Sequence, residues 1–149
     1  MGFFTDIWNQ FNKVILNTPL HGITSKNTIL ITFRGRKSGL EYTTPVNYTQ
    51  HGNTIRITSL AERSWWRNLI KNPDVIITLR GKQLKGTAEV FRARDKVTQE
   101  LENYLKPVPR MARYFKVKID PDGKFNEQDL FNAGENRVMI KIHLNSSNF

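Results

Sequence analysis

The sequence contains no cysteine among its 149 residues, which excludes disulfide bonds, thiol nucleophiles and thiolate metal sites. It also lacks any apolar run of the roughly 18 residues that a transmembrane helix requires. No basic-then-apolar secretion signal opens the chain, since Asp6 and Asn9 interrupt the early apolar residues. We therefore expect a cytoplasmic protein, and the length fits a single domain over residues 1–149.

Histidine is scarce, and His21, His51 and His143 are too far apart along the chain to indicate a metal site. Asp120 and Asp122 have the spacing of the first ligands of a calcium loop, but no further ligands follow, so this stretch predicts a turn. No serine lies in a nucleophile-elbow motif. Metal centres and hydrolase chemistry are therefore not expected.

Acidic residues are also few relative to basic ones. Lysine and arginine total 23 against 13 acidic residues, which gives a formal net charge of +10 and a pI near 10.1. This excess suits a polyanionic partner such as nucleic acid, an anionic lipid surface or a phosphorylated cofactor. The basic residues are spread along the chain without a long block, so composition alone does not choose among these partners.

Apolar residues at helical spacing near the N-terminus predict an amphipathic helix over residues 1–18, ended by Pro19. Such a helix suits a lid over one end of the core. It also suits a membrane-surface helix, because its apolar face is rich in aromatic residues. The residues on this face are Phe4, Ile7, Trp8, Phe11, Val14 and Ile15.

From residue 27 onward, apolar and polar residues alternate and predict six strands, most of them joined by tight turns. These turns favour an antiparallel sheet, and closing it into a barrel removes its exposed edges. Helices are predicted over residues 65–71, capped by Ser64, and over 97–105, 110–117 and 127–133. The fold class is therefore α+β, a six-stranded antiparallel barrel with short C-terminal helices. The predicted strands are residues 28–34, 41–50, 54–60, 75–79, 83–91 and 138–144.

The turn between the first two strands has the most distinctive chemistry. Gly35 and Gly39 allow backbone angles that point successive N–H groups into one hollow. Arg36, Lys37 and Ser38 add charge-assisted donors at the same place, a combination that fits a phosphate. The alternative is an ordinary exposed hairpin turn with solvated cations.

Two adjacent tryptophans begin the helix predicted over residues 65–71. Neighbours on a helix lie about 100° apart, so Trp65 and Trp66 cannot both face the core. We expect one of them to be buried and the other to be exposed or to line a cleft. One interpretation is that the pair only packs, with one ring in the core and the other at its edge. The alternative is that the pair forms an aromatic wall for a planar ring, with Arg67 facing an anion.

The Thr-Phe-Arg-Gly-Arg-Lys-Ser-Gly run at residues 32–39 is followed by Tyr-Thr-Thr-Pro-Val at 42–46. Together they closely resemble the deazaflavin-dependent nitroreductase family, whose members are split β-barrel oxidoreductases that bind flavins or deazaflavins. The resemblance continues through residues 64–69, 75–91 and 109–144. It implies an FMN-binding type of split barrel and a bound deazaflavin coenzyme, F-420, with FMN as the alternative. The protein would then pass a hydride to a small planar acceptor such as a quinone, nitro compound or activated alkene.

The resemblance also implies which residues bind the cofactor. The turn would hold its phosphate, the second strand would back its ring system, and the end of the third strand would touch the ring. In better-known F-420 users a Ser-Lys-Gly-Gly-type stretch follows that strand, whereas Leu60 comes next here, and Tyr42 replaces a common arginine. The implied cofactor-binding residues are Arg36, Lys37, Ser38, Gly39, Thr44, Pro45 and Ser59.

At the acceptor site we expect Trp65 or Trp66 to act as a wall for the ring or substrate. Tyr114 is expected to line the acceptor pocket, to donate a proton, or only to pack. Relatives are often homodimers, and the predicted N-terminal helix offers peripheral membrane contact. The alternative function is a non-catalytic basic module that binds a cofactor or nucleic acid through its charge and exposed aromatic residues.

Overall fold

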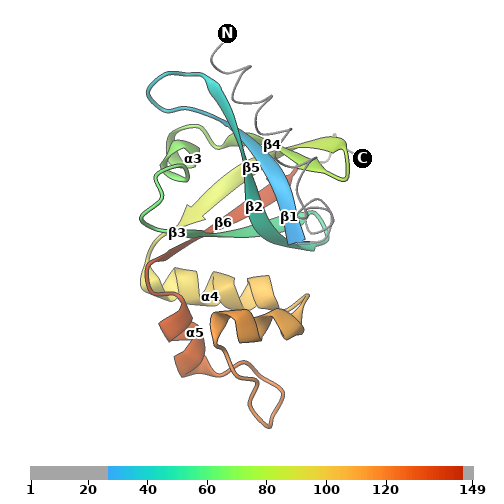
Figure 1. Ribbon diagram of the computed structural model, residues 1–149, viewed down its shortest axis with the longest axis vertical. Coiled ribbons are helices and arrows are strands. Elements are labelled where there is room, and N and C mark those ends of the chain that lie inside the picture. Colours follow the sequence, from blue (N-terminus) through green and yellow to red (C-terminus); the bar gives the residue numbers. More distant parts are fainter. Residues whose placement is uncertain (1–26, 146–149) are drawn as a thin grey trace.

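The computed structural model describes residues 27–145, which form a closed barrel of six antiparallel strands. The strands follow the order β1-β2-β3-β6-β5-β4 around the barrel, and β4 pairs with β1 to close it (Figure 1). The predicted antiparallel barrel is confirmed, with each strand end within one residue of its predicted position. The helix predicted over residues 1–18 lies outside the described residues. The strands are β1 (Thr28–Arg34), β2 (Glu41–His51), β3 (Thr54–Leu60), β4 (Asp74–Leu79), β5 (Lys82–Phe91) and β6 (Arg137–Leu144).

Apolar side chains that alternate along β3 point into the barrel interior, while β1 and β6 also bury three consecutive residues each. In β3, Ile55 and Ile57 are completely buried while their neighbours are partly exposed, because successive side chains of a strand point to opposite faces. The β2–β3 hairpin turns at Gly52, whose φ of 60° lies in the left-handed region that glycine adopts without strain. The period-two pattern of the sequence is therefore the pattern of the core.

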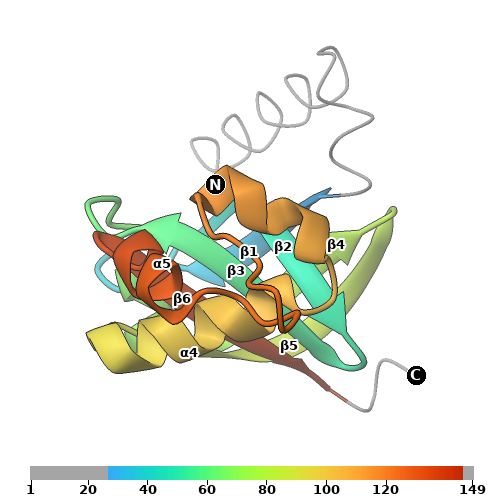
Figure 2. The ribbon, with the colours of Figure 1, turned by 90° about the horizontal axis from the view of Figure 1, so that it is seen from below.

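The longer helix α4 (Arg94–Leu105) follows β5 and packs across one end of the barrel, beside α5 (Glu127–Ala133). Figure 2 shows both helices in front of the strands, with the 3₁₀ helix η1 (Pro109–Phe115) close by. Val97, Leu101 and Tyr104 lie at helical spacing on the buried side of α4. An ion pair of 2.8 Å between Arg56 Nε and Glu100 Oε2 joins this helix to β3.

The short helix α3 (Arg67–Lys71) connects β3 to β4 and begins later than predicted. Ser64 does not cap it through its hydroxyl, because residues 64–66 form a turn and Trp66 occupies the cap position. The Ser64 carbonyl instead accepts a hydrogen bond from the backbone nitrogen of Arg67 at 3.1 Å. Over residues 27–145, none of the helices has the length and apolar character to span a lipid bilayer.

Candidate functional site

A cleft of about 450 Å³ opens between the β1–β2 turn and the start of α3. We call it the turn cleft. Its walls combine aromatic rings with cationic and hydroxyl side chains. The aromatic lining residues are Phe33, Tyr42 and Trp65, and the polar ones used below are Arg36, Lys37, Ser38, Thr44, Ser64 and Asn68.

The turn is closed by its own backbone. The Gly35 nitrogen donates to the Leu40 carbonyl at 2.7 Å, and the Gly39 nitrogen donates to the Gly35 carbonyl at 3.0 Å. Gly39 has a φ of 73°, in the left-handed region that favours glycine. The Ser38 hydroxyl accepts from the Leu40 nitrogen at 3.2 Å. The turn is thus a defined loop on which the basic side chains are carried.

Asn68 joins this turn to α3. Its Oδ1 accepts hydrogen bonds from the backbone nitrogen of Arg36 at 2.9 Å and from Arg36 Nη1 at 3.1 Å. Its Nδ2 donates to the Trp65 carbonyl at 2.8 Å. Asn68 was not predicted as a site residue, because its partner lies 32 positions away and no local pattern signals the contact.

Lys37 is the least constrained cation of the turn. It is exposed, and within residues 27–145 it makes no hydrogen bond or ion pair. Its ammonium group is therefore available to an anionic ligand at the cleft. Arg36, by contrast, is partly buried and already oriented by Asn68.

Three aromatic rings form one wall of the turn cleft. The ring centroids of Phe33 and Tyr42 are 6.1 Å apart with an angle of 29° between the planes, and those of Phe33 and Trp65 are 5.7 Å apart with an angle of 43°. Trp65 Nε1 donates a hydrogen bond of 3.0 Å to Ser59 Oγ, which fixes the indole. Ser59 itself is buried at the end of β3, so it meets the cleft through Trp65.

Gly35 provides the space that this wall needs. A Cβ atom at this position would lie 2.8 Å from Tyr42 Cε2 and 2.9 Å from Ser38 Oγ, closer than real Cβ contacts allow. The Tyr42 hydroxyl lies 3.2 Å from Ser38 Oγ, within hydrogen-bond distance. The absence of a side chain at Gly35 therefore lets the Tyr42 ring pack against the turn and brings its hydroxyl next to Ser38.

The remaining predicted site residues lie elsewhere. The expectation that one tryptophan of the pair is buried and the other lines a cleft is confirmed: Trp66 is only 1% exposed and belongs to the core, and Trp65 lines the turn cleft. Trp66 is therefore not part of the aromatic wall of this cleft. Pro45 is exposed and is not among the residues that line the turn cleft, whereas Thr44 lines it. Tyr114 is 69% exposed on η1 and does not line the turn cleft.

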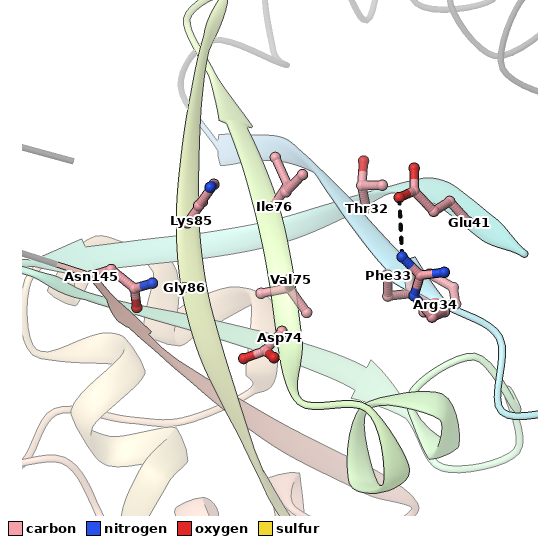
Figure 3. Close-up of a pocket in the computed structure, with 10 residues that line it drawn as sticks. All are labelled: Thr32, Phe33, Arg34, Glu41, Asp74, Val75, Ile76, Lys85, Gly86 and Asn145. Atoms are coloured by element: carbon pink, nitrogen blue, oxygen red, sulfur yellow. Dashed lines mark ion pairs between the residues drawn. The ribbon is translucent and has the colours of Figure 1, made fainter. Parts of the chain in front are cut away.

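A second cleft, of about 470 Å³, lies over β1, β4 and β5 (Figure 3). Its charges are mixed, since Asp74 and Glu41 line it together with Lys85 and Arg34. Arg34 Nη2 is already 3.6 Å from Glu41 Oε1. Carboxylates repel phosphate, so the turn cleft suits an anionic cofactor better than this one.

The residues of the turn cleft fit a planar cofactor that carries a phosphate. Arg36, Lys37 and Ser38 offer charged and hydroxyl donors at one end. Trp65 and the other two rings offer apolar surface for a conjugated ring next to those donors. Within residues 27–145, no group of histidine, aspartate and glutamate side chains is arranged to hold a metal ion.

Residues 7–119 match the model of the family described as F420H(2)-dependent quinone reductase, where F420H(2) is the reduced form of coenzyme F-420. No curated protein matches the sequence significantly.

Solved structures share the fold at low identity. A Bacteroides thetaiotaomicron protein assigned to 5-nitroimidazole antibiotic resistance is 15% identical, with a TM-score of 0.55 over 93% of this chain and 80% of its own. A Listeria innocua protein assigned as a pyridoxamine 5′-phosphate oxidase is 14% identical, with a TM-score of 0.52 over 92% of this chain and 94% of its own. The closed six-stranded barrel agrees with the split β-barrel fold of such proteins.

Proposed function

The chain belongs to the family of F420H(2)-dependent quinone reductases, and from this premise we propose that its turn cleft is where coenzyme F-420 binds. The protein is an oxidoreductase that uses F-420 and transfers a hydride to a small planar acceptor. The observation that carries the proposed site is the exposed Lys37, unpaired within residues 27–145, beside the preorganised Arg36 at the edge of an aromatic wall.

Arg36, Lys37 and Ser38 hold the cofactor phosphate in this proposal. Arg36 is oriented by Asn68 before a ligand arrives, so little side-chain entropy is lost when it binds an oxyanion. Lys37 contributes a mobile charge, and the Ser38 hydroxyl adds a donor. Charge-assisted contacts of this kind contribute about 1.5–3 kcal/mol each.

The aromatic wall holds the ring system. Trp65, which packs against the buried Phe33, presents an apolar face on which a conjugated ring can stack. The hydrogen bond from Trp65 Nε1 to Ser59 Oγ fixes the orientation of the indole. A cofactor ring stacked on this indole is therefore held in a defined position beside the turn. When bound, reduced F-420 supplies the hydride, and the protein positions its ring against the acceptor.

We propose that Tyr114, which is exposed on η1 and lies outside the lining of the turn cleft, contacts an acceptor that extends beyond that cleft. Arg113 Nη2 donates a hydrogen bond of 3.4 Å to the Tyr114 hydroxyl, and this contact lowers the pKa of the phenol. A more acidic phenol is a better proton donor to a reduced quinone. Tyr114→Phe should lower the rate of quinone reduction without changing F-420 affinity, and an unchanged rate would remove Tyr114 from the reaction.

The function is tested by following oxidation of reduced F-420 by a soluble naphthoquinone. The wild-type protein should catalyse it, and Lys37→Ala should raise the KM for reduced F-420 about tenfold through loss of one charge-assisted contact. Lys82→Ala, which removes the same charge from an exposed position of β5, is the matched control and should leave KM unchanged. Failure of the wild-type protein to oxidise reduced F-420 with quinone, nitro and activated-alkene acceptors would overturn the proposal.

A further inference from the structure

Three arginines line a separate cleft of about 460 Å³ on the other side of α3. Arg67 comes from α3, Arg92 follows the end of β5, and Arg137 begins β6. Segments distant in the sequence thus bring three cations to one cavity. We call it the triple-arginine cleft.

The buried Trp66 positions two of these cations. The Cζ atom of Arg67 lies 4.5 Å from the Trp66 ring centroid, and that of Arg92 lies 5.1 Å from it. The ring is held in turn by a hydrogen bond of 3.3 Å from its Nε1 to the Ala61 carbonyl. Cation–π contact with one fixed ring therefore holds two positive charges near each other.

Arg137 is fixed independently and is partly buried. Its Nη1 donates to Thr58 Oγ1 at 3.3 Å, and its Cζ lies 4.9 Å from the centroid of Phe115. Burial removes part of the solvation of the Arg137 guanidinium and so lowers its pKa. An anion at this guanidinium would recover the lost interaction energy.

Among residues 27–145, Arg67, Arg92 and Arg137 make no ion pair with a carboxylate. Ion pairs elsewhere in this part of the chain join Arg34 to Glu41, Arg56 to Glu100 and His143 to Glu89. Gathering like charges without counter-charges is unfavourable for folding alone. A bound anion removes that repulsion.

We propose that the triple-arginine cleft binds a small organic anion with two or more carboxylate or phosphate groups. Guanidinium groups present paired N–H donors that match both oxyanions. Ala61, Ala93 and Val138 complete the lining and leave room for a short carbon skeleton. The volume is within the range of small-molecule sites.

This site is distinct from the turn cleft, although both use α3. Trp65 and Asn68 line the turn cleft, whereas Trp66 and Arg67 line the triple-arginine cleft. The short helix therefore separates the two cavities. The inference does not depend on the cofactor assignment, because its observations concern only the second set of residues.

The test is calorimetric titration of the full chain with citrate and with pyrophosphate, at about 150 mM salt so that exposed charges are screened. Pyrophosphate is also expected at the turn cleft, so each titration is repeated in Lys37→Ala. We expect the Lys37→Ala variant to bind at least one of the two anions saturably at a single site. Arg92→Gln and Arg137→Gln should each weaken this binding about tenfold. A preference for citrate or pyrophosphate identifies the anion class.

Arg80→Gln is the matched control, since it removes one exposed guanidinium from the β4–β5 turn and should leave the affinity unchanged. Thermal unfolding of each variant shows whether the fold is retained, and Arg92 is exposed, so its variant should fold normally. The proposal is overturned if neither probe binds saturably, if Arg80→Gln weakens binding as much as Arg92→Gln, or if Lys37→Ala abolishes all binding.

Discussion

The Asn68 side-chain oxygen accepts two hydrogen bonds from Arg36, one from its backbone nitrogen at 2.9 Å and one from Nη1 at 3.1 Å. The same amide donates to the Trp65 carbonyl at 2.8 Å. One residue of α3 thus fixes the position of the turn, the direction of its arginine and the backbone of the tryptophan in the aromatic wall. The turn cleft is held together by this residue.

Asn68→Ala should therefore weaken F-420 binding although Asn68 itself need not touch the cofactor. Removing Oδ1 frees Arg36 to rotate and leaves two donors unpaired, so we expect a loss of about 1–3 kcal/mol in binding free energy. F-420 fluorescence quenching measures the affinity. Asn132→Ala, on the exposed side of α5, is the control. An affinity equal to that of the wild type would show that the turn does not need this contact.

The two turn glycines should respond differently to alanine. Gly35→Ala places a methyl group against Tyr42 and Ser38, so these side chains must move and F-420 affinity should fall at least tenfold. Gly39→Ala meets no atoms within 4 Å but has a φ of 73°, so it should cost about 1–2 kcal/mol of stability through backbone strain. Urea unfolding and F-420 titration of both variants separate the two effects. A normal affinity for Gly35→Ala would contradict the close packing of Tyr42.

The adjacent tryptophans should also separate into different roles. Trp66→Ala should lower the free energy of unfolding by about 3–5 kcal/mol, because it empties a fully buried site. Trp65→Ala should cost less stability but reduce F-420 affinity, since Trp65 is only partly buried and lines the cleft. Chemical denaturation and cofactor titration are the measurements. Equal losses of affinity at the two positions, with both variants folded, would contradict this division.

Tyr104→Phe should stabilise the protein by about 1 kcal/mol at neutral pH. The Tyr104 hydroxyl is buried without a hydrogen-bond partner among the described residues, and an unsatisfied hydroxyl costs desolvation energy. Denaturant unfolding of the two proteins measures this difference. A destabilised Tyr104→Phe variant would show that the hydroxyl contributes a favourable contact.

The same variant should change the alkaline limb of the stability profile. Burial raises the pKa of Tyr104 from 10.0 to about 12, so the folded state favours the protonated phenol. This contribution to stability is complete below about pH 10 and is lost as the pH rises from 10 to 12. Tyr104→Phe should lose less stability over that interval, although Tyr48 has a pKa raised by burial and still contributes. Identical alkaline limbs would contradict the burial of an ionisable group at this position.

Most of the fold follows from local patterns in the sequence. Alternation along residues such as Ile55 and Ile57 identifies strands, and glycines such as Gly52 identify tight hairpins, because both effects act over a few residues. The start of α3 was misplaced at Ser64. Serine is a favourable N-cap residue, but the helix starts only after Trp66, whose side chain is buried in the core.

The site is only partly visible in the sequence. The turn at residues 35–39 and the tryptophan pair stand out because their residue types are unusual at that spacing. The turn and the tryptophan form a cleft because of hydrogen bonds between different elements of the fold. These hydrogen bonds join Asn68 to Arg36 and Trp65 to Ser59. The three arginines of the second cleft come from three separate segments. Such convergence depends on the closed barrel, and no local pattern predicts it.

The central claim is that the turn binds the cofactor phosphate, and equilibrium titration of the Arg36→Ala/Lys37→Ala double variant with F-420 tests it most directly. Two charge-assisted contacts predict a loss of about 2–4 kcal/mol in binding free energy, or roughly 30- to 1000-fold in Kd. Arg80→Ala/Lys82→Ala removes the same two charges from the β4–β5 turn and should bind as the wild type does. Wild-type affinity in the folded Arg36→Ala/Lys37→Ala variant would contradict the account.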